Sequence, residues 1–264
     1  MDPSWQTAIS YTTEDDIRIR GYDLLEMIGR VPFSHALYLI FTGELPTPAV
    51  GRLIDAILVA SIDHGPVTPS SLTARTAASG GAPLKTAAAA GFLSLDRFHG
   101  AAVEDCMNVL ERVLTLSKNY SGDDALRQAA EEVVRESRQA KTKIPGFGHR
   151  QHLYDKRVDK LFELAEQADV EGSYMKAARM LAVVLEGVVG KPVPINIDGV
   201  VAAVLCELKF PPSLGNAPFL VARLTGILAH THEEITQMPR MRRIDPFNYS
   251  YCGPENRSLP DIYK

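Results

Sequence analysis

The amino-acid sequence predicts an all-helical protein, and three observations support this fold class. Apolar residues recur at three- and four-residue spacing through most of the 264 residues. Glycines and prolines, which helices do not accept in their interiors, separate these segments. The alternation of apolar and polar residues that is typical of strands appears only in IRIRGY, residues 17–22.

The first half of the chain contains four helical segments by this reading. Residues 22–43 hold two helical patterns, one before Gly29 and one after Pro32, and GELPTP ends the second. Residues 50–62 form the next apolar-periodic helix. A turn-rich stretch, DHGPVTPSS, leads into residues 72–95, which we expect to form one helix rich in small residues.

The second half continues in the same way. Amphipathic patterns predict helices over residues 101–118, 123–140, 155–169 and 172–190. Two prolines and NIDG then break the chain before a short apolar helix, VVAAVLCEL, and a long helix follows over residues 214–237. The remaining residues carry prolines and no helical period, so we expect them to be irregular.

The composition is that of a globular protein. Hydrophobic residues make up 45% and charged residues 23% of the chain, which argues against disorder. The net charge of −4 provides no basic field of the kind that nucleic acid requires. Basic residues do cluster locally at 147–160 and 239–243, which suits the phosphates or carboxylates of a small ligand.

The cysteines and the N-terminus bear on the cellular compartment. Cys106, Cys206 and Cys252 lie far apart with no metal-ligand spacing, which fits a reducing environment. The first residues, MDPSWQTAIS, lack the features of a signal peptide, and no apolar stretch reaches the ~18 residues of a membrane span. We therefore expect a soluble, cytoplasmic protein.

Four polar breaks between the predicted helices each place a titratable residue beside a glycine: Asp63-His64-Gly65, Arg97-Phe98-His99-Gly100, Gly146-Phe147-Gly148-His149 and Asn196-Ile197-Asp198-Gly199. Glycine lets a backbone approach a ligand closely, and a helix that starts at such a turn offers free N–H groups to anions. The alternative is that these residues only cap helices, since aspartate is a good N-cap residue.

The ordered motifs DHG, RFHGAA, PGFGHR, NIDG and FLVARLTGILAH resemble the citrate synthase superfamily over nearly the whole chain. RGY and GELPT near the N-terminus resemble the same family. The likeness is greatest to the short citryl-CoA lyases and to the lyase module of ATP-citrate lyase. That module is similar in DHGP and in Asn-x-Asp-Gly, where the synthases more often have Asn-Val-Asp-Phe.

The resemblance implies a citrate-synthase-like helical fold with two lobes. Residues 1–99 and 199–264 would form the large domain and residues 100–198 the small domain, with a hinge near His99 and Asp198. Closure of such a hinge would assemble the catalytic groups and exclude water. The family likeness also implies a homodimer.

The dimer interface would use the apolar, small-residue segments 56–62 and 72–93, since alanine- and glycine-rich faces let helices approach closely. The alternative is tight packing of these segments inside one chain, which the sequence supports nearly as well.

The resemblance further implies three catalytic residues. His99 would hydrogen-bond the thioester carbonyl of acetyl-CoA and stabilise the enolate. Asp198 would remove the methyl proton, aided by a pKa raised in an apolar cleft. His149 would bond the ketone oxygen of oxaloacetate. These roles reverse in cleavage, and they require no metal and no permanently bound cofactor, because the CoA thioester is the substrate.

The resemblance also implies the binding residues. A CoA-binding wall would comprise Pro145, Gly146, Phe147 and Gly148. Arg157 and Arg223 would bind substrate carboxylates, since a guanidinium pairs with a carboxylate bidentately. His64 would bind the substrate on the oxaloacetate side. The alternative is that both arginines are surface residues. Lys156 stands where the family has proline. The histidines at 35, 152, 230 and 232 are interpreted as structural or surface residues.

One departure concerns the clamping arginine that synthases supply from the partner subunit. Phe247 stands at that position after Pro246, and Arg242 and Arg243 lie just upstream as candidate substitutes. In lacking an arginine at this position, the chain resembles the lyases. The leading hypothesis is therefore a citryl-CoA lyase. A short citrate or methylcitrate synthase, or a non-catalytic regulatory homologue, are the alternatives.

Overall fold

Helices dominate the structure, and the all-helical prediction is confirmed. The computed structural model describes residues 6–96, 99–100, 102–148, 155–242, 252–253 and 258. Within these residues the α-helices are α1 (Leu24–Met27), α2 (Phe33–Thr42), α3 (Pro48–Ser61), α4 (Pro69–Ser79), α5 (Leu84–Leu93), α6 (Ala102–Ser117), α7 (Ala125–Gln139), α8 (Lys156–Gln167), α9 (Ser173–Val189), α10 (Ile197–Glu207) and α11 (Ala217–Gln237), with a short 3₁₀-helix η1 (Pro212–Leu214).

A small antiparallel sheet precedes the helices, with strands β1 (Ser10–Thr12), β2 (Ile17–Ile19) and β3 (Tyr22–Asp23) in the order β1-β2-β3. The strand predicted over residues 17–22 is shorter than expected, because Arg20 and Gly21 adopt positive φ angles of 49° and 87° and turn the chain. The Arg20 side chain donates from Nη2 to the Ile40 carbonyl at 2.6 Å, which ties this turn to the last turn of α2.

Helix ends follow the local sequence. Thr47 caps α3 by accepting a hydrogen bond from the Val50 N–H at 3.3 Å, and Pro48 occupies its first turn. Gly43 ends α2 and Gly190 ends α9, both in the left-handed conformation that glycine adopts without strain. These signals explain why most predicted boundaries lie close to the observed ones.

The single helix predicted over residues 72–95 is wrong. The structure divides this segment into α4 and α5, separated by Gly80-Gly81-Ala82-Pro83. Gly81 has a φ of 100°, outside the helical range, and Pro83 has no N–H to continue a helical hydrogen-bond pattern. The uniform run of small residues conceals this break in the apolar pattern.

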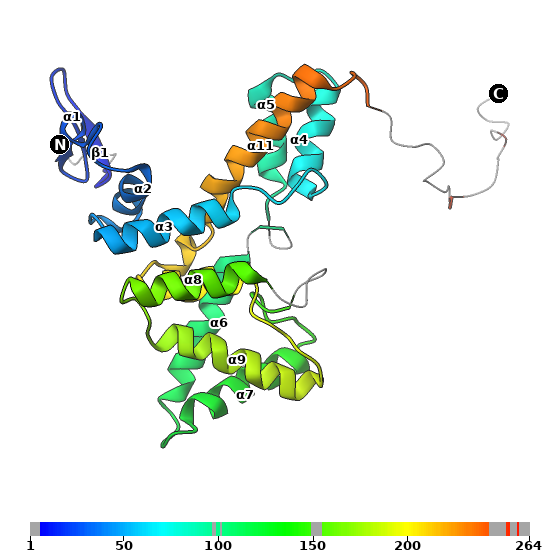
Figure 1. Cartoon of the computed structure of the whole chain (residues 1–264). Helices are drawn as coiled ribbons and strands as arrows, with labels where there is room; N and C mark the ends of the chain where they lie inside the picture. The colour runs from blue at the N-terminus through cyan, green and yellow to red at the C-terminus, as the bar shows by residue number, and fades with distance from the viewer. Residues whose placement is uncertain are drawn as a thin grey trace.

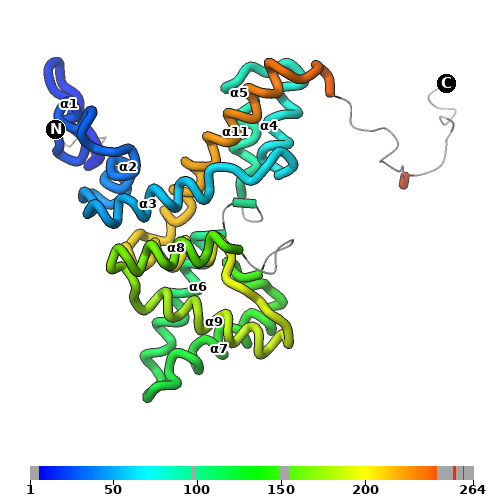
Figure 2. The backbone as a smooth tube through the Cα atoms, in the orientation of Figure 1, coloured from blue at the N-terminus to red at the C-terminus, as the bar shows by residue number. Residues whose placement is uncertain are grey.

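The helices form two groups. Helices α4, α5 and α11 pack together, and α6, α7, α8, α9 and α10 form the other group (Figure 1). Helix α3 contacts both groups, packing on α11 and on α8. The chain trace in Figure 2 brings the C-terminal α11 back beside α4 and α5. Helix α10 begins at the predicted boundary near residue 198 and packs on α6, α8 and α9 of the second group. The domain boundaries stay a prediction.

Two cores hold these groups together. The larger core spans α2 and α3 and the helices from α6 to α10, with Ile57, Met107 and Leu205 fully buried. The smaller core joins Ala74, Ala88 and Ile227 of α4, α5 and α11. Small residues are required there, because a Cβ added to α5 at its glycine, Gly91, would lie 2.6 Å from the Ser70 carbonyl oxygen. Part of the 72–93 segment thus packs inside one chain.

Two further findings concern helix hydrophobicity and the cysteines. Among the described residues, no helix combines the length and the hydrophobicity needed to cross a membrane. The three cysteines are free thiols, and Cys106 and Cys206 are buried. Burial raises the pKa of Cys206 to about 12, with nearby carboxylates adding to the effect, so this thiol stays protonated and unreactive.

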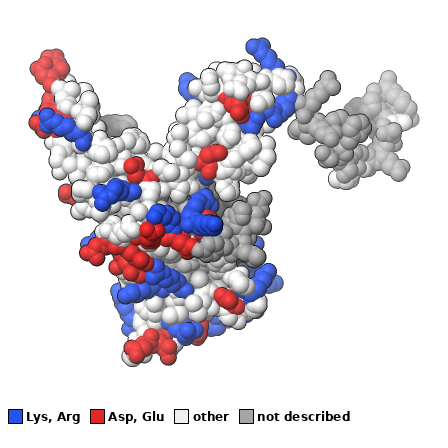
Figure 3. All heavy atoms as spheres, in the orientation of Figure 1, with Lys and Arg blue, Asp and Glu red and all other residues white. Residues whose placement is uncertain are grey.

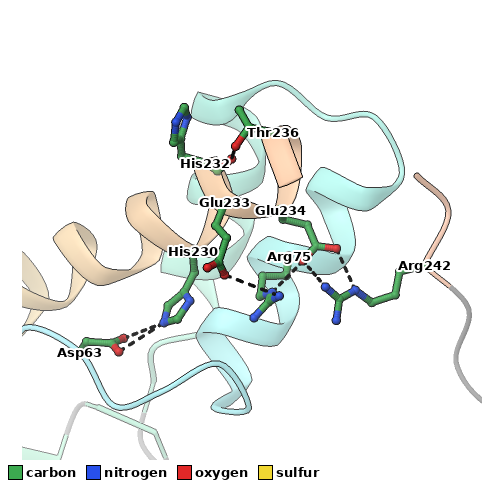
Figure 4. A network of polar contacts seen from close by, with 8 residues as sticks. All are labelled: Asp63, Arg75, His230, His232, Glu233, Glu234, Thr236 and Arg242. Atoms are coloured by element: carbon green, nitrogen blue, oxygen red, sulfur yellow. Dashed lines mark hydrogen bonds and ion pairs between the residues drawn. The ribbon is translucent and has the colours of Figure 1, made fainter. Parts of the chain in front are cut away.

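A buried carboxylate joins α4, α11 and the segment after α11 (Figure 4). The Glu234 side chain is fully buried and accepts from Arg75 Nε at 2.7 Å and from Arg242 Nη2 at 2.6 Å. Burial raises the pKa of Glu234, but the hydrogen bonds from both arginines outweigh it, and the net pKa lies below its usual range. Glu234 is therefore an anion under ordinary conditions.

Replacing Glu234 with alanine is expected to lower the free energy of unfolding by about 3–5 kcal/mol, because Arg75 loses its buried partner and keeps only the more distant, exposed Glu233. The matched control is Glu163→Ala, which removes an ion pair with Lys160 whose side chains are 51% and 61% exposed; its expected cost is about 0–1 kcal/mol. Urea unfolding followed by circular dichroism measures both. Equal losses in the two variants would contradict a structural role for the Glu234 network.

Candidate active site

Two arginines meet at the C-terminal end of α3. Arg223 of α11 donates from Nε to the Ser61 carbonyl at 3.1 Å, and Arg157 of α8 donates from Nη1 to the Ala60 carbonyl at 3.2 Å. The last carbonyls of a helix lack intrahelical donors and carry partial negative charge. Consecutive carbonyls of one helix therefore bring together two cations that are distant in sequence.

Arg223 is buried, with 4% of its surface exposed, and its guanidinium carbon lies 4.6 Å from the centre of the Phe219 ring. Burial lowers the pKa of Arg223, while the carboxylates of Asp63 and Asp198 oppose that change. An arginine remains charged in proteins. The sequence-based alternative that Arg223 is a surface residue is therefore wrong.

Arg157 is held by the residue that starts its own helix. The Asp155 carboxylate accepts from the Arg157 backbone N–H at 3.0 Å, which caps α8, and from Nη2 at 2.7 Å. Lys156 stands at the first helical position, where the sequence resemblance led us to expect proline. Proline at that position favours helix initiation, and the Asp155 cap supplies the same function here.

Asp198 lies in the first turn of α10, where the positive charges of Arg157 and Arg223 act on its carboxyl group. Asn196 caps this helix, since its Oδ1 accepts from the Asp198 N–H at 3.0 Å and from the Gly199 N–H at 3.2 Å. Burial raises the pKa of the Asp198 carboxyl, and the charges of Arg157 and Arg223 act against the increase. A carboxyl group in this position suits proton transfer to or from a weakly acidic carbon.

The predicted CoA wall packs directly against α10. Gly148 donates its N–H to the Pro194 carbonyl at 2.7 Å, and the Asn196 Nδ2 donates to the Gly148 carbonyl at 2.8 Å. Gly146, with a φ of 84°, lies against Gly199 so closely that a Cβ on Gly199 would overlap the Gly146 carbonyl oxygen. This backbone contact fixes the wall beside Asp198.

His99 approaches the site from a tight turn in which its N–H donates to the Asp96 carbonyl at 2.6 Å. The Nε2 atom accepts from the Ser70 N–H in the first turn of α4 at 3.2 Å and lies 2.9 Å from the Ser70 Oγ. An accepting Nε2 places the proton of the neutral ring on Nδ1. A Cβ on Gly100 would lie 2.5 Å from the Phe219 ring, so this turn reaches the aromatic ring that underlies Arg223.

His64 lies in the loop that follows α3 and is exposed. The preceding Asp63 accepts from the Gly65 N–H at 3.0 Å. Burial raises the pKa of Asp63, but hydrogen bonds from the Gly65 and His64 N–H groups and from His230 outweigh it and give a lowered pKa. Asp63 is therefore a stable anion at the edge of the arginine cluster.

The structure brings several predicted site residues together and leaves others undescribed. Asp198, Arg157 and Arg223 act on one another, and the 145–148 wall and the loop with His64 adjoin them. His149 and His152 lie outside the described residues, as do Arg243, Pro246 and Phe247. His35 is partly buried, with its ring against Gly51 of α3, and so has a packing role.

Arg242, a candidate substitute for the clamping arginine, has another partner in this chain. It binds Glu234, which lies three helical turns beyond Arg223 on α11, or about 16 Å along the helix. Arg242 therefore anchors the segment after α11 to the helix.

Sequence reasoning missed Ser70 and Asp155 as positioning residues, and it named Asn196 in a polar break without recognising that it caps α10. Each stands at a helix start, which is the one local signal that was available.

Two grooves flank the site. One of about 440 Å³ opens between α6, α7 and the segment that leads into Pro145. The other, of about 470 Å³, lies between α8 and α9 and touches Asp155 and Ile195. Within the described part of the chain, no group of three His, Cys, Asp or Glu side chains is arranged to hold a metal ion.

Comparison with known proteins finds a matching family and several solved structures of similar fold. Residues 46–244 match the family described as "Citrate synthase, C-terminal domain". The solved structure of citryl-CoA lyase from Hydrogenobacter thermophilus has a TM-score of 0.88 and 35% sequence identity to this chain, over 99% of both chains. ATP citrate lyase from Methanothrix soehngenii has a TM-score of 0.83 at 19% identity, over 97% of this chain and 42% of that chain, which shows a common fold.

A longer relative covers most of this chain. Citrate synthase from Synechocystis sp. is 27% identical over 247 residues, which are 90% of this chain and 59% of that protein. The chain thus spans less than two thirds of the length of this relative.

Replacing Gly199 with alanine is expected to destabilise the fold by about 1–3 kcal/mol, because the added methyl group overlaps the Gly146 carbonyl and forces α10 away from the 145–148 wall. Gly187 of α9 is the matched control, since a Cβ there meets no atom within 4 Å. Its replacement with alanine is expected to stabilise the protein by about 0.5–1 kcal/mol. Thermal unfolding compares the two variants, and a neutral Gly199→Ala would show that the close backbone contact is unnecessary.

Proposed function

Because the chain belongs to the citrate synthase family, we propose that it catalyses the reversible aldol-type cleavage of citryl-CoA to acetyl-CoA and oxaloacetate. The family membership expected from the sequence motifs is confirmed. Similarity to the Hydrogenobacter citryl-CoA lyase over 99% of both chains supports the lyase activity. The observation in the structure that carries the proposal is the placement of Arg157 and Arg223 on consecutive carbonyls of α3, from where their charges act on the partly buried Asp198.

Cleavage begins at the hydroxyl group of citryl-CoA. His149, the residue after the 145–148 wall, removes the hydroxyl proton, and the resulting alkoxide collapses to the ketone of oxaloacetate as the carbon–carbon bond breaks. The electron pair of that bond becomes the enolate of acetyl-CoA. The balance requires one proton at carbon, which Asp198 donates.

His99 and Asp198 divide the stabilisation of this enolate. His99 is assigned to the enolate oxygen, because a neutral imidazole that accepts from Ser70 at Nε2 carries its proton on Nδ1 and is a hydrogen-bond donor. Asp198 alternates between acid and base as the direction of the reaction changes. The raised pKa of Asp198 supports this role, since it brings the protonated form closer to the working pH.

The carboxylates of the substrate are assigned to the arginines and to His64. Both guanidinium groups supply N–H donors for a carboxylate, and Arg157 would do so in addition to its pair with Asp155 through Nε and Nη2. CoA is assigned to the wall formed by Pro145, Gly146, Phe147 and Gly148. Gly148 permits close approach of the pantetheine chain, whereas Gly146 packs against Gly199 inside the protein. The groove of about 440 Å³ beside Pro145 offers space for the rest of the CoA moiety.

The proposal includes the two-lobed organisation and hinge expected from the sequence, and a homodimer.

The structure leaves large apolar side chains exposed on the α4, α5 and α11 group, including Leu72, Leu84, Leu93 and Ile235. Leu93 is the most exposed of these four residues, at 80%. Figure 3 shows few charges over the face of these helices in view, in contrast to the α6–α9 group. A second copy of this chain is the proposed occupant of that apolar surface.

Light scattering at micromolar concentration is expected to give the mass of two chains. Replacing the most exposed residue, Leu93→Lys, should shift the mass toward one chain, since a buried charge at an interface is unfavourable. Leu25→Lys on α1, which changes a 76%-exposed side chain away from the α4–α5–α11 surface, serves as the control. A wild-type mass of one chain would exclude the dimer.

The closest competing activity is that of a short citrate or methylcitrate synthase, because citrate synthases are among the relatives. A synthase also hydrolyses the thioester, so it releases free thiol from acetyl-CoA and oxaloacetate. The lyase hypothesis predicts oxaloacetate formation from citryl-CoA that is faster than thiol release from acetyl-CoA plus oxaloacetate. Rapid thiol release with accumulation of citrate would instead assign a synthase, and absence of both activities would assign a non-catalytic homologue.

Asp198→Asn is expected to lower turnover of citryl-CoA by roughly 10²-fold or more, because the amide cannot exchange a proton with the enolate carbon. His99→Ala and His149→Ala should cause losses of similar size. Asp159→Asn, which changes an exposed carboxyl in the first turn of α8, controls for the loss of one negative charge. Near-full activity in Asp198→Asn would refute the assignment of the base.

A further inference from the structure

A histidine outside the proposed catalytic and binding residues contacts the loop that carries His64. His230 of α11 is half-buried, and its Nε2 lies 3.2 and 3.3 Å from the two carboxylate oxygens of Asp63 (Figure 4). The neighbouring Glu233 and Glu234 are directed instead toward Arg75 of α4. Asp63 is therefore the acidic partner of His230.

The loop at residues 62–65 rests directly on the same face of α11. A Cβ added to Gly226, one turn before His230, would lie 2.5 Å from the Ile62 carbonyl oxygen and 2.8 Å from the Asp63 Oδ1. Gly226 and His230 together thus form a seat for Asp63, one by close backbone approach and the other by a hydrogen bond. A side chain at 226 would move the loop away from the helix.

This seat lies next to the groups that bind carboxylates. Asp63 follows the end of α3, where the Ser61 carbonyl holds Arg223, and it precedes His64 in the chain. The charge of Asp63 also acts on Arg223 and favours its cationic form. A displacement of Asp63 would therefore disturb both the position of His64 and the electrostatic balance around Arg223.

We propose that His230 is a positioning residue for the keto-acid site, acting through Asp63 to hold the loop at residues 62–65 in its substrate-binding arrangement. His230 does not itself contact the substrate in this arrangement. The inference rests on the proposed function, because it assigns His64 and Arg223 to the oxaloacetate portion of the substrate. It predicts an effect on keto-acid binding and none on CoA binding.

The test compares three variants. His230→Leu removes the hydrogen bond to Asp63, and His230→Gln keeps an N–H donor near the position of Nε2. His232→Leu is the matched control, because His232 is exposed on the same helix and its ring points away from Asp63 in Figure 4. Isothermal titration calorimetry measures the affinity of each variant for oxaloacetate and for CoA.

His230→Leu is expected to weaken oxaloacetate binding by about tenfold, the size of the loss of one hydrogen bond to a charged group. His230→Gln should stay within about twofold of the wild type, since the donor is retained, and so should His232→Leu. All variants should bind CoA with wild-type affinity, and KM for the keto acid should rise with kcat unchanged.

A double-mutant cycle with Asp63→Asn tests the route of the effect. If His230 acts through Asp63, His230→Leu adds little to the loss already caused by Asp63→Asn. Amide hydrogen exchange at residues 62–65 in the unliganded protein gives an activity-independent readout. Exchange there should be faster in His230→Leu than in His232→Leu.

The outcomes separate this inference from the proposed function. Wild-type oxaloacetate affinity in His230→Leu, or additive losses in the double-mutant cycle, would overturn the positioning role. Equal weakening of oxaloacetate and CoA binding would also overturn it, because it would indicate general destabilisation. Failure of the wild-type protein to bind oxaloacetate would refute the proposed function, whereas faster exchange of the loop in His230→Leu would still support the contact.

Discussion

The last turn of α3 is the constraint on which the rest of the site depends. Its two final carbonyls, at Ala60 and Ser61, accept hydrogen bonds from Arg157 and Arg223, which belong to the two different groups of helices. Two guanidinium groups repel each other, and Arg157 indeed lowers the pKa of Arg223. The partial negative charge of the helix end offsets that repulsion, so one helix terminus both joins the two groups and holds two cations together.

The carboxylates around these arginines have different environments and therefore different chemistry. Asp63 receives backbone N–H donors and is held as an anion with a lowered pKa. Asp155 is committed to Arg157 and to the start of α8. Asp198 has burial as its dominant influence, and its pKa is raised even though both arginines oppose the shift. Of the three, Asp198 alone combines access to the protonated form with a place beside the glycine wall, which suits an acid–base role.

Much of the fold was predictable because most helices bury one apolar face. The helices over residues 102–117 and 173–189 lie within a few residues of their predicted bounds. The break between α4 and α5 was missed because alanine and glycine supply no contrast between faces. Asp198 and Arg223 were identified through family motifs, whereas the contacts of His230 with Asp63 and of Arg157 with Ala60 join elements distant in sequence, which no local pattern records.

The central claim is that α3 presents Arg157 and Arg223 as a receptor for the carboxylates of oxaloacetate beside Asp198. A crystal structure of the protein with oxaloacetate bound tests it most directly. The expected result is a ligand whose carboxylates lie within about 3 Å of both guanidinium groups, with the Ala60 and Ser61 carbonyls still bonded to the arginines. Oxaloacetate bound elsewhere, or arginines released from α3 when the ligand binds, would contradict this claim.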